Sequence, residues 1–213
     1  MLSEGQFPTG YFNRMDNSAD ENFYQMPRLV VHIDDHAIQT LSQTFARILP
    51  VTGSYLDLMS SWRTHLPDTL HPDRVVGLGM NEAEMQDNPQ LDDVIVHNLN
   101  QDPTLPFDDA TFDAVTCTVS VQYMVKPLTI FREVNRVLKP GGIFAVSFSN
   151  RCFQQKAVAV WLSTTDEQHV QLVNQYFTDG GNWTGLQTER TPSKMRLSGF
   201  TDPLYVIWAS KQP

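Results

Sequence analysis

The segment HIDDH holds four side chains that can bind a metal ion, namely His32, Asp34, Asp35 and His36. Imidazole nitrogens and carboxylate oxygens are ordinary metal ligands, but a metal site needs a complete coordination shell, and no further cluster in the sequence supplies one. A carboxylate just before a helix also accepts hydrogen bonds from the free N–H groups of the first turn. Because a helical pattern follows at once, we predict that Asp34 or Asp35 caps a helix and that the chain has no metal site.

A second group of polar residues follows a buried strand. The stretch SYLDLMSSW reads as a strand, Tyr55–Leu58, that runs into a helix. In nucleotide-binding α/β folds this junction carries several glycines, because glycine permits a positive φ and a close approach of the backbone to the ligand. Met59, Ser61 and Arg63 stand at the candidate positions instead. A nicotinamide cofactor is therefore excluded, because the glycine fingerprint and the acid that binds its ribose are both absent.

Two residues near the N-terminus could bind a carboxylate. Tyr24 and Arg28 are four residues apart, so they would share one face of a helical turn. A guanidinium binds a carboxylate with two parallel hydrogen bonds. The alternative is that Tyr24 packs against the protein and Arg28 is solvated.

The composition indicates a globular protein. Of the 213 residues, 41% are hydrophobic and 18% are charged, and no apolar run approaches the roughly 20 residues of a membrane span. The net charge of −9 repels phosphate backbones, so we expect no nucleic-acid partner. Cys117 and Cys152 fit no metal spacing and are expected to be free thiols in a reducing compartment.

Apolar patterning predicts alternating helices and strands. Ile38, Leu41, Phe45 and Ile48 form one face of a first helix, and Pro50 follows its end. Near-continuous apolar runs are typical of parallel strands buried between two helix layers. Such runs lie near residues 55–58, 74–78, 93–97, 112–121 and 141–149.

The C-terminal part has a different pattern. Two helical segments, around 156–162 and 167–177, precede two strand-like runs, TGLQTERT and PLYVIWAS. A Gly/Ser/Pro-rich loop joins these runs, which predicts an antiparallel hairpin at the edge of the sheet. We expect residues 1–22 to form a mobile arm and residues 23–213 to form one domain, in which residues 23–50 are a lid and a helix.

Two segments then carry a family resemblance. LPFDDATFDAV and FREVNRVLKPGGIFAVSF are similar to the core of class I S-adenosylmethionine-dependent methyltransferases, whose usual wording is LPF-x-D-x-x-FD-x-V and R-E-x-x-R-V-L-K-P-G-G. The likeness covers about Tyr55 to Phe148. The segments HIDD, LDLMSSW, GLGMN and SFSNRCF resemble a narrower subgroup, methyltransferase-like proteins of plants, algae and cyanobacteria with a first motif that lacks glycine.

The resemblance implies a fold and a location. The fold is a doubly wound, Rossmann-like α/β domain with a mostly parallel seven-stranded sheet and an antiparallel C-terminal strand. With the free thiols, the resemblance implies a soluble protein of the cytoplasm or the plastid stroma. The oligomeric state stays open.

The resemblance also implies a cofactor site for S-adenosylmethionine, with S-adenosylhomocysteine as product, across the carboxyl ends of the first strands. Open α/β sheets bind ligands at that edge. Gly79 falls where the family has an acid that binds the ribose, and Asn98 or Asn100 falls near the adenine amino group. The implied cofactor-binding residues are Tyr24, Arg28, Asp57, Met59, Ser60, Ser61, Gly79, Met80, Asn81, Asn98, Asn100, Thr118 and Val119.

The chain departs from the family by lacking both the glycines and the ribose acid. S-adenosylmethionine has no phosphate, so side chains can replace the close approach of backbone amides. We predict a clamp in which Arg28, Tyr24 and the hydroxyls of Ser60 and Ser61 hold the amino-acid end of the cofactor. A neutral amide at Asn81 is a weaker partner for the ribose than a carboxylate, so we expect micromolar rather than nanomolar affinity.

Residues for the methyl acceptor are less defined. The resemblance implies an acceptor pocket with Tyr123, Asn150 and Arg151, although packing or helix capping explains the same residues. His65 and His71 are expected to be solvated, and no residue is identified as a catalytic base. Oxygen, nitrogen and carbon acceptors all remain open.

Two functions follow from these residues. The first is a methyltransferase that transfers the methyl group to a small-molecule acceptor by direct displacement. The second is a non-catalytic protein of the same fold that binds the cofactor weakly or not at all and serves as a binding or interaction module. The missing glycines and acid favour the second function, and uptake of S-adenosylmethionine would favour the first.

Overall fold

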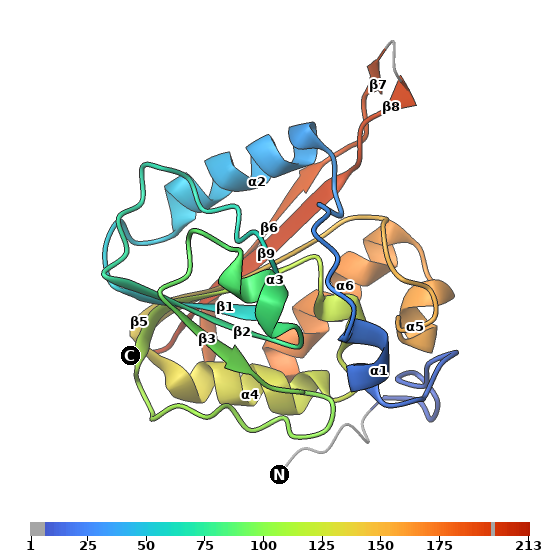
Figure 1. The fold of residues 1–213 in the computed structure, drawn as a ribbon, viewed down its shortest axis with the longest axis horizontal. Helices are drawn as coiled ribbons and strands as arrows, with labels where there is room; N and C mark the ends of the chain where they lie inside the picture. The colour runs from blue at the N-terminus through green and yellow to red at the C-terminus, as the bar shows by residue number, and fades with distance from the viewer. Residues whose placement is uncertain (1–6, 197–198) are drawn as a thin grey trace.

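The computed structural model describes residues 7–196 and 199–213, which form a seven-stranded sheet with strand order β3-β2-β1-β4-β5-β9-β6 (Figure 1). The pairs β1–β2, β1–β4, β2–β3 and β4–β5 are parallel, whereas β9 is antiparallel to β5 and β6. This confirms the predicted α/β fold with its antiparallel C-terminal strand. The strands are β1 Ser54–Ser60, β2 Arg74–Gly79, β3 Asp93–Val96, β4 Phe112–Thr118, β5 Leu138–Phe148, β6 Trp183–Thr191, β7 Met195–Arg196, β8 Gly199–Phe200 and β9 Leu204–Lys211.

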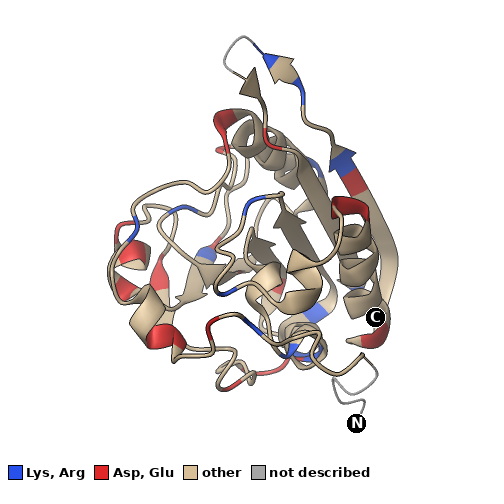
Figure 2. Ribbon diagram, turned by 90° about the vertical axis from the view of Figure 1, so that its right-hand side faces the viewer, with Lys and Arg blue, Asp and Glu red and all other residues tan. Residues whose placement is uncertain are grey.

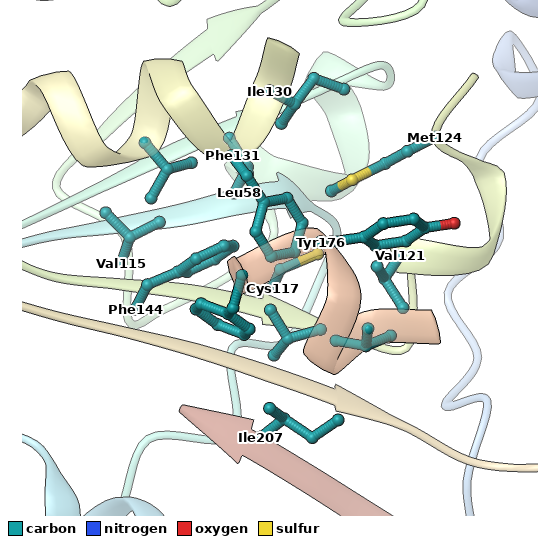
Figure 3. Close-up of a cluster of buried hydrophobic side chains, with 14 of the residues drawn as sticks. Leu58, Val115, Cys117, Val121, Met124, Ile130, Phe131, Phe144, Tyr176 and Ile207 are labelled. Atoms are coloured by element: carbon teal, nitrogen blue, oxygen red, sulfur yellow. The ribbon is translucent and has the colours of Figure 1, made fainter. Parts of the chain in front are cut away.

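Helices cover both faces of the sheet. Successive side chains of a strand point to opposite faces. Leu56 of β1 accordingly belongs to a cluster with α4 and α6, and Tyr55 belongs to a second cluster with α2. In the first cluster, the ring centroid of Phe131 lies 5.0 Å from that of Phe144 and 5.6 Å from that of Tyr176 (Figure 3). The helices are α1 Asp20–Tyr24, α2 Asp35–Ile48, α3 Glu82–Gln86, α4 Pro127–Val137, α5 Ala159–Leu162 and α6 Asp166–Asp179, with a short 3₁₀ turn, η2, at Val121–Tyr123.

The cap of α2 agrees with the sequence analysis. The Asp34 carboxylate accepts a hydrogen bond from the Ala37 backbone N–H at 2.8 Å, so the acidic pair of HIDDH starts a helix as predicted. Among residues 7–196 and 199–213, no three His, Cys, Asp or Glu side chains are grouped to hold a metal ion. In the same residues, no helix is long and apolar enough to cross a membrane.

The predicted helix after β1 is wrong. Residues 61–73 form an irregular connection to β2. His65 has a φ of 59°, which no right-handed helix permits. Side chains that follow β2 and α3 hold the connection instead: the Asn88 amide donates to the Ser61 carbonyl, and the Thr64 hydroxyl donates to the Gln90 side chain.

The described part of the N-terminal arm packs on the domain. Phe7, Tyr11 and Phe12 contact the main hydrophobic cluster, although the sequence analysis placed residues 1–22 outside the domain. Backbone hydrogen bonds from the N–H groups of Ala159 and Val160 to residues 13 and 11 hold this segment against α5. Residues 1–6 of the predicted arm lie outside the described residues. The separation at residue 22 is therefore corrected: residues 7–22 are part of the folded unit.

Candidate functional site

A pocket lies at the carboxyl ends of β1, β2 and β4, beneath α1 and residues 25–34, which we call the strap. Its empty space is about 1170 Å³, part of it open to solvent. All thirteen residues that the resemblance assigned to the cofactor line this pocket. The structure thus brings them together, while their part in binding stays a prediction.

Strained backbone is concentrated at this pocket. Four described residues other than glycine have a positive φ, and three of them line the pocket: Met59 at 57°, His65 at 59° and Val119 at 52°. A β-branched residue such as valine is a true outlier in this region. Such strain costs about 1–3 kcal/mol per residue and is found preferentially at ligand sites. Met59 also shows that the loop keeps a glycine-like backbone without a glycine.

Asp57 is the buried acid of β1. Its carboxylate accepts hydrogen bonds from the Ser60 hydroxyl at 2.5 Å and from the Thr116 hydroxyl at 3.0 Å. Burial raises the pKa of Asp57 to about 6, and the two hydroxyl groups oppose that effect only in part. Because the Ser60 hydroxyl donates inward to Asp57, it has no proton left to donate to a ligand.

The second serine of the predicted clamp is also engaged. The Ser61 hydroxyl donates to the Glu84 carboxylate at 2.6 Å, and the same carboxylate accepts the Arg28 backbone N–H at 2.6 Å. Glu84 is only 8% exposed and lines the pocket, although the sequence analysis did not single it out. The sequence did contain a signal for Glu84, because it lies three residues after Asn81, the cap of α3, where a capping box places a Glu.

Arg28 lines the pocket and has an unsatisfied hydrogen-bond donor. One terminal nitrogen donates to the Phe23 carbonyl at 2.8 Å, and the guanidinium carbon lies 4.5 Å from the centre of the Phe23 ring. The other terminal nitrogen, Nη1, is buried and has no hydrogen-bond partner among the described residues. A buried guanidinium N–H without a partner is costly, so an anionic ligand group would satisfy it. Tyr24 lines the same wall, and burial raises its pKa far above the ordinary value.

The second strand ends without room for an acid. A Cβ atom at Gly79 would lie 2.2 Å from the Ser60 carbonyl oxygen, so no side chain fits there. The Asn81 amide does not replace the acid, because its nitrogen donates to the Tyr24 carbonyl at 2.7 Å and its oxygen caps Glu84. Its nitrogen also donates to the Gln25 carbonyl at 3.3 Å, so Asn81 connects α3 to the end of α1 and the start of the strap.

Two asparagines after β3 connect the pocket to α1. The Asn98 amide donates to the Glu21 carboxylate at 2.8 Å, and the Asn100 amide donates to the Asp20 carboxylate at 3.0 Å. Asp20 is 4% exposed and also binds Arg14 at 2.7 Å. Both asparagines thus line the pocket while holding its cover, and the acid Asp20 joins the wall without any signal in the sequence.

The end of β4 presents a second unsatisfied group. The Thr118 hydroxyl is buried and has no hydrogen-bond partner among the residues described. Tyr123, from η2, faces the pocket, and its hydroxyl accepts the Phe153 N–H at 2.9 Å. Met80 lines the pocket as an apolar surface next to Gly79.

Two histidines line the pocket, contrary to the solvated state expected for His65. Burial lowers the pKa of His65 to about 4 and lowers that of His32 as well. Both imidazoles are therefore uncharged at neutral pH and can accept a hydrogen bond. His71 is exposed, as expected.

Two residues of the predicted acceptor pocket lie elsewhere. Asn150 and Arg151 are exposed and do not line the pocket. The Arg151 guanidinium instead donates to the Asp202 carboxylate at 2.8 Å, because the chain turns away from the pocket after β5. Phe153, two residues further on, lines the pocket in their place.

Known methyltransferases resemble this chain in sequence and in fold. A model of the methyltransferase domain family matches residues 63–146. A methyltransferase structure from Thermotoga maritima, titled a possible histamine N-methyltransferase, superposes with a TM-score of 0.59 over 83% of this chain and 90% of that chain. The chain has the fold of class I methyltransferases, and part of its sequence matches the model of their domain. The family model covers the stretch from the loop after β1 to the middle of β5.

The shared fold leaves the reaction open. The Thermotoga protein is 15% identical, and the cyclase SpnF superposes with a TM-score of 0.57 at 14% identity over 87% of this chain and 89% of that chain. Such likeness establishes the fold alone. Malonyl-(acyl-carrier protein) O-methyltransferase from Marinomonas sp. (strain MWYL1) is 30% identical over 66 residues, which are 31% of this chain and 24% of that protein. The chain spans about a quarter or less of the length of the curated relatives it matches.

Proposed function

We propose that the chain binds S-adenosylmethionine in the pocket and transfers its methyl group to a small-molecule acceptor. The observation that carries the proposal is the buried Arg28 Nη1 without a partner, at the carboxyl edge of a methyltransferase fold. The cofactor has one carboxylate, and a guanidinium is its best protein partner.

The rest of the pocket suits the same cofactor. S-adenosylmethionine carries two positive groups, its sulfonium and its ammonium, and the pocket wall contains the acids Asp20, Asp57 and Glu84. Leu78 and Met80 offer apolar surface at the position where the superfamily packs adenine. The unpartnered Thr118 hydroxyl offers a further hydrogen bond at the end of β4.

The chain's own residues would orient and enclose the reactants. The bound cofactor supplies an electrophilic methyl group, so alignment and exclusion of water make up most of the protein's task. The strap and α1 cover the pocket and exclude water. The uncharged imidazoles of His32 and His65 can accept a hydrogen bond from an acceptor hydroxyl or amine, which fixes its orientation.

A second function has its own support. Gly79 excludes the ribose acid, and Asn81, Ser60 and Ser61 are already engaged within the protein. The predicted clamp therefore reduces to Arg28 and Tyr24. A protein of this fold that binds a different carboxylate ligand, without methyl transfer, is the alternative proposal.

Calorimetric titration distinguishes the two functions. We expect S-adenosylmethionine and S-adenosylhomocysteine to bind the wild type with micromolar affinity, and Arg28→Ala to weaken both by about 10- to 100-fold through loss of a charge-assisted pair. Arg74→Ala, at the opposite edge of the sheet, is the matched control and should bind normally. Absence of binding at millimolar ligand would support the second function. Equal binding by Arg28→Ala and wild type would remove Arg28 from the site.

A further inference from the structure

Residues 192–196 and 199–203, between β6 and β9, form a projecting hairpin. β7 and β8 pair with each other and not with the main sheet, and they extend away from the body (Figure 1). Met195 and Phe200 are directly opposite each other and are 78% and 71% exposed. They are the two most exposed large hydrophobic side chains on the described surface besides Met15. Two large apolar side chains on one projecting pair are not explained by packing within the chain.

The same hairpin is locally basic. Lys194 and Arg196 flank Met195, are exposed, and form no ion pair with any other residue the structure describes. No acidic residue occurs from Thr191 to Thr201, although the whole chain has a net charge of −9. The basic residues stand out at the end of the hairpin, away from most of the acidic ones (Figure 2). Basic and apolar side chains are thus combined at one point of an acidic protein.

The strap carries a second exposed apolar segment. Leu29, Val30 and Val31 are consecutive and are 49%, 54% and 44% exposed. A run of exposed apolar residues in a soluble protein generally has a function. Val30 and Val31 also line the pocket, so this segment lies at its mouth.

The strap and the hairpin are joined. The Asp34 N–H donates to the Asp202 carboxylate at 3.0 Å, and the Asp202 N–H donates to the Asp34 carboxylate at 2.8 Å. β6 runs in the same direction as β5, because both are antiparallel to β9. The hairpin therefore leaves the sheet at its carboxyl edge, which is also the edge of the pocket.

We propose that the hairpin and the strap dock the protein on an anionic lipid surface. Interfacial segments combine bulky apolar side chains, which enter the boundary of the acyl chains, with Lys and Arg, which remain near the anionic head groups. The positive charges of Lys194 and Arg196 complement the negative charge of such a surface. The hairpin extends away from most of the acidic side chains, whose charges physiological salt screens over roughly 8 Å. The proposal does not depend on cofactor binding, since it concerns the outer surface.

Vesicle flotation tests the proposal with the full chain. We expect wild type to bind vesicles of phosphatidylserine and phosphatidylcholine in about equal amounts, to release them as salt rises, and to bind pure phosphatidylcholine much more weakly. Lys194→Glu with Arg196→Glu should weaken binding by about 25-fold or more, because each cation contributes about fivefold. Met195→Ser with Phe200→Ser should weaken it at unchanged charge, and Leu29→Ser with Val30→Ser should do so for the strap.

Matched controls lie at the opposite edge of the sheet. Val51 is 56% exposed just before β1, and Arg74 begins β2 with its side chain about half exposed. Val51→Ser and Arg74→Glu should bind vesicles like wild type, and the hairpin and strap variants should keep the wild-type unfolding temperature. Failure of wild type to bind anionic vesicles would overturn the proposal, as would hairpin variants that bind normally. Concentration-dependent dimers that Phe200→Ser abolishes, without vesicle binding, would assign the hairpin to self-association instead.

Discussion

Met59 has a left-handed backbone at the position where relatives of this fold use glycine. An L-residue in that conformation costs roughly 1–2 kcal/mol, a cost that glycine avoids. The loop therefore keeps a left-handed backbone at this position without glycine, the residue type that adopts this conformation at little cost. The missing glycine is therefore a substitution within a loop whose backbone conformation is kept.

Gly79 gives the clearest prediction at the scale of one residue. Gly79→Ala should lower the free energy of unfolding by at least about 2 kcal/mol, because the added Cβ meets the backbone oxygen of Ser60, which cannot move alone. Gly77→Ala is the matched control in the same strand. Its added Cβ meets the end of the flexible Leu91 side chain, so it should cost about 1 kcal/mol or less. Urea denaturation measures both, and equal costs would contradict the packing argument.

Asp57 predicts a pH dependence of stability. Its pKa is about 6 in the folded protein and is near the ordinary value of 3.8 in the unfolded chain. Between pH 4 and pH 6 the folded state holds one more proton at Asp57 than the unfolded state does. The contribution of Asp57 to the free energy of unfolding is therefore fully present below pH 4 and is lost as the pH rises through 6. The difference corresponds to about 3 kcal/mol.

Asp57→Asn removes that titration, and the stability of each protein is compared with its own value at another pH. The variant should lose less stability than wild type between pH 4 and pH 7, whatever its absolute stability. Urea denaturation at several pH values gives the comparison. Parallel curves for the two proteins would show that folding does not raise the pKa of Asp57.

At the scale of elements, the connection after β1 shows where sequence patterns are insufficient. The sequence places apolar and polar residues from Trp62 to Leu70 at spacings that a helix would also satisfy. Pro67 interrupts that spacing, because proline lacks an N–H and disfavours a helix at the residue before it. Contacts to the later residues Asn88 and Gln90, together with the positive φ of His65, hold the irregular path. Those partners are chosen by the folded sheet, so a local pattern does not reveal them.

Lys156 provides a prediction for the N-terminal segment. Its side chain is fully buried, and the ammonium lies 2.9 Å from the Asp16 carboxylate and 3.2 Å from that of Asp20. Lys156→Met should lower the free energy of unfolding by about 3–5 kcal/mol, because it leaves buried Asp20 with less compensation. Lys194→Met, on the exposed hairpin, should stay within about 0.5 kcal/mol of wild type in chemical denaturation. A small effect at both lysines would mean that the N-terminal segment contributes little to stability.

At the scale of the whole molecule, the order of apolar runs was enough to predict the sheet. Strands buried on both faces have near-continuous apolar sequence, as in the run from Phe112 to Val121, and the hairpin pattern marked the antiparallel end. The positions at the strand ends came from the family resemblance, and the parallel strands bring Met59, Gly79 and Thr118 to one edge. The acids Asp20 and Glu84 were not predicted, since they reach the pocket through contacts between segments far apart in the chain.

The paired hydrogen bonds between Asp34 and Asp202 also bear on how the protein is made. The two residues are 168 positions apart. At a synthesis rate of about 5–20 residues per second, residue 202 is added roughly 8–34 s after residue 34. Throughout that interval the nascent chain has no partner to fix the end of the strap, and Leu29, Val30 and Val31 are available to chaperones. The contact between the strap and the segment before β9 is therefore a late event of biosynthesis.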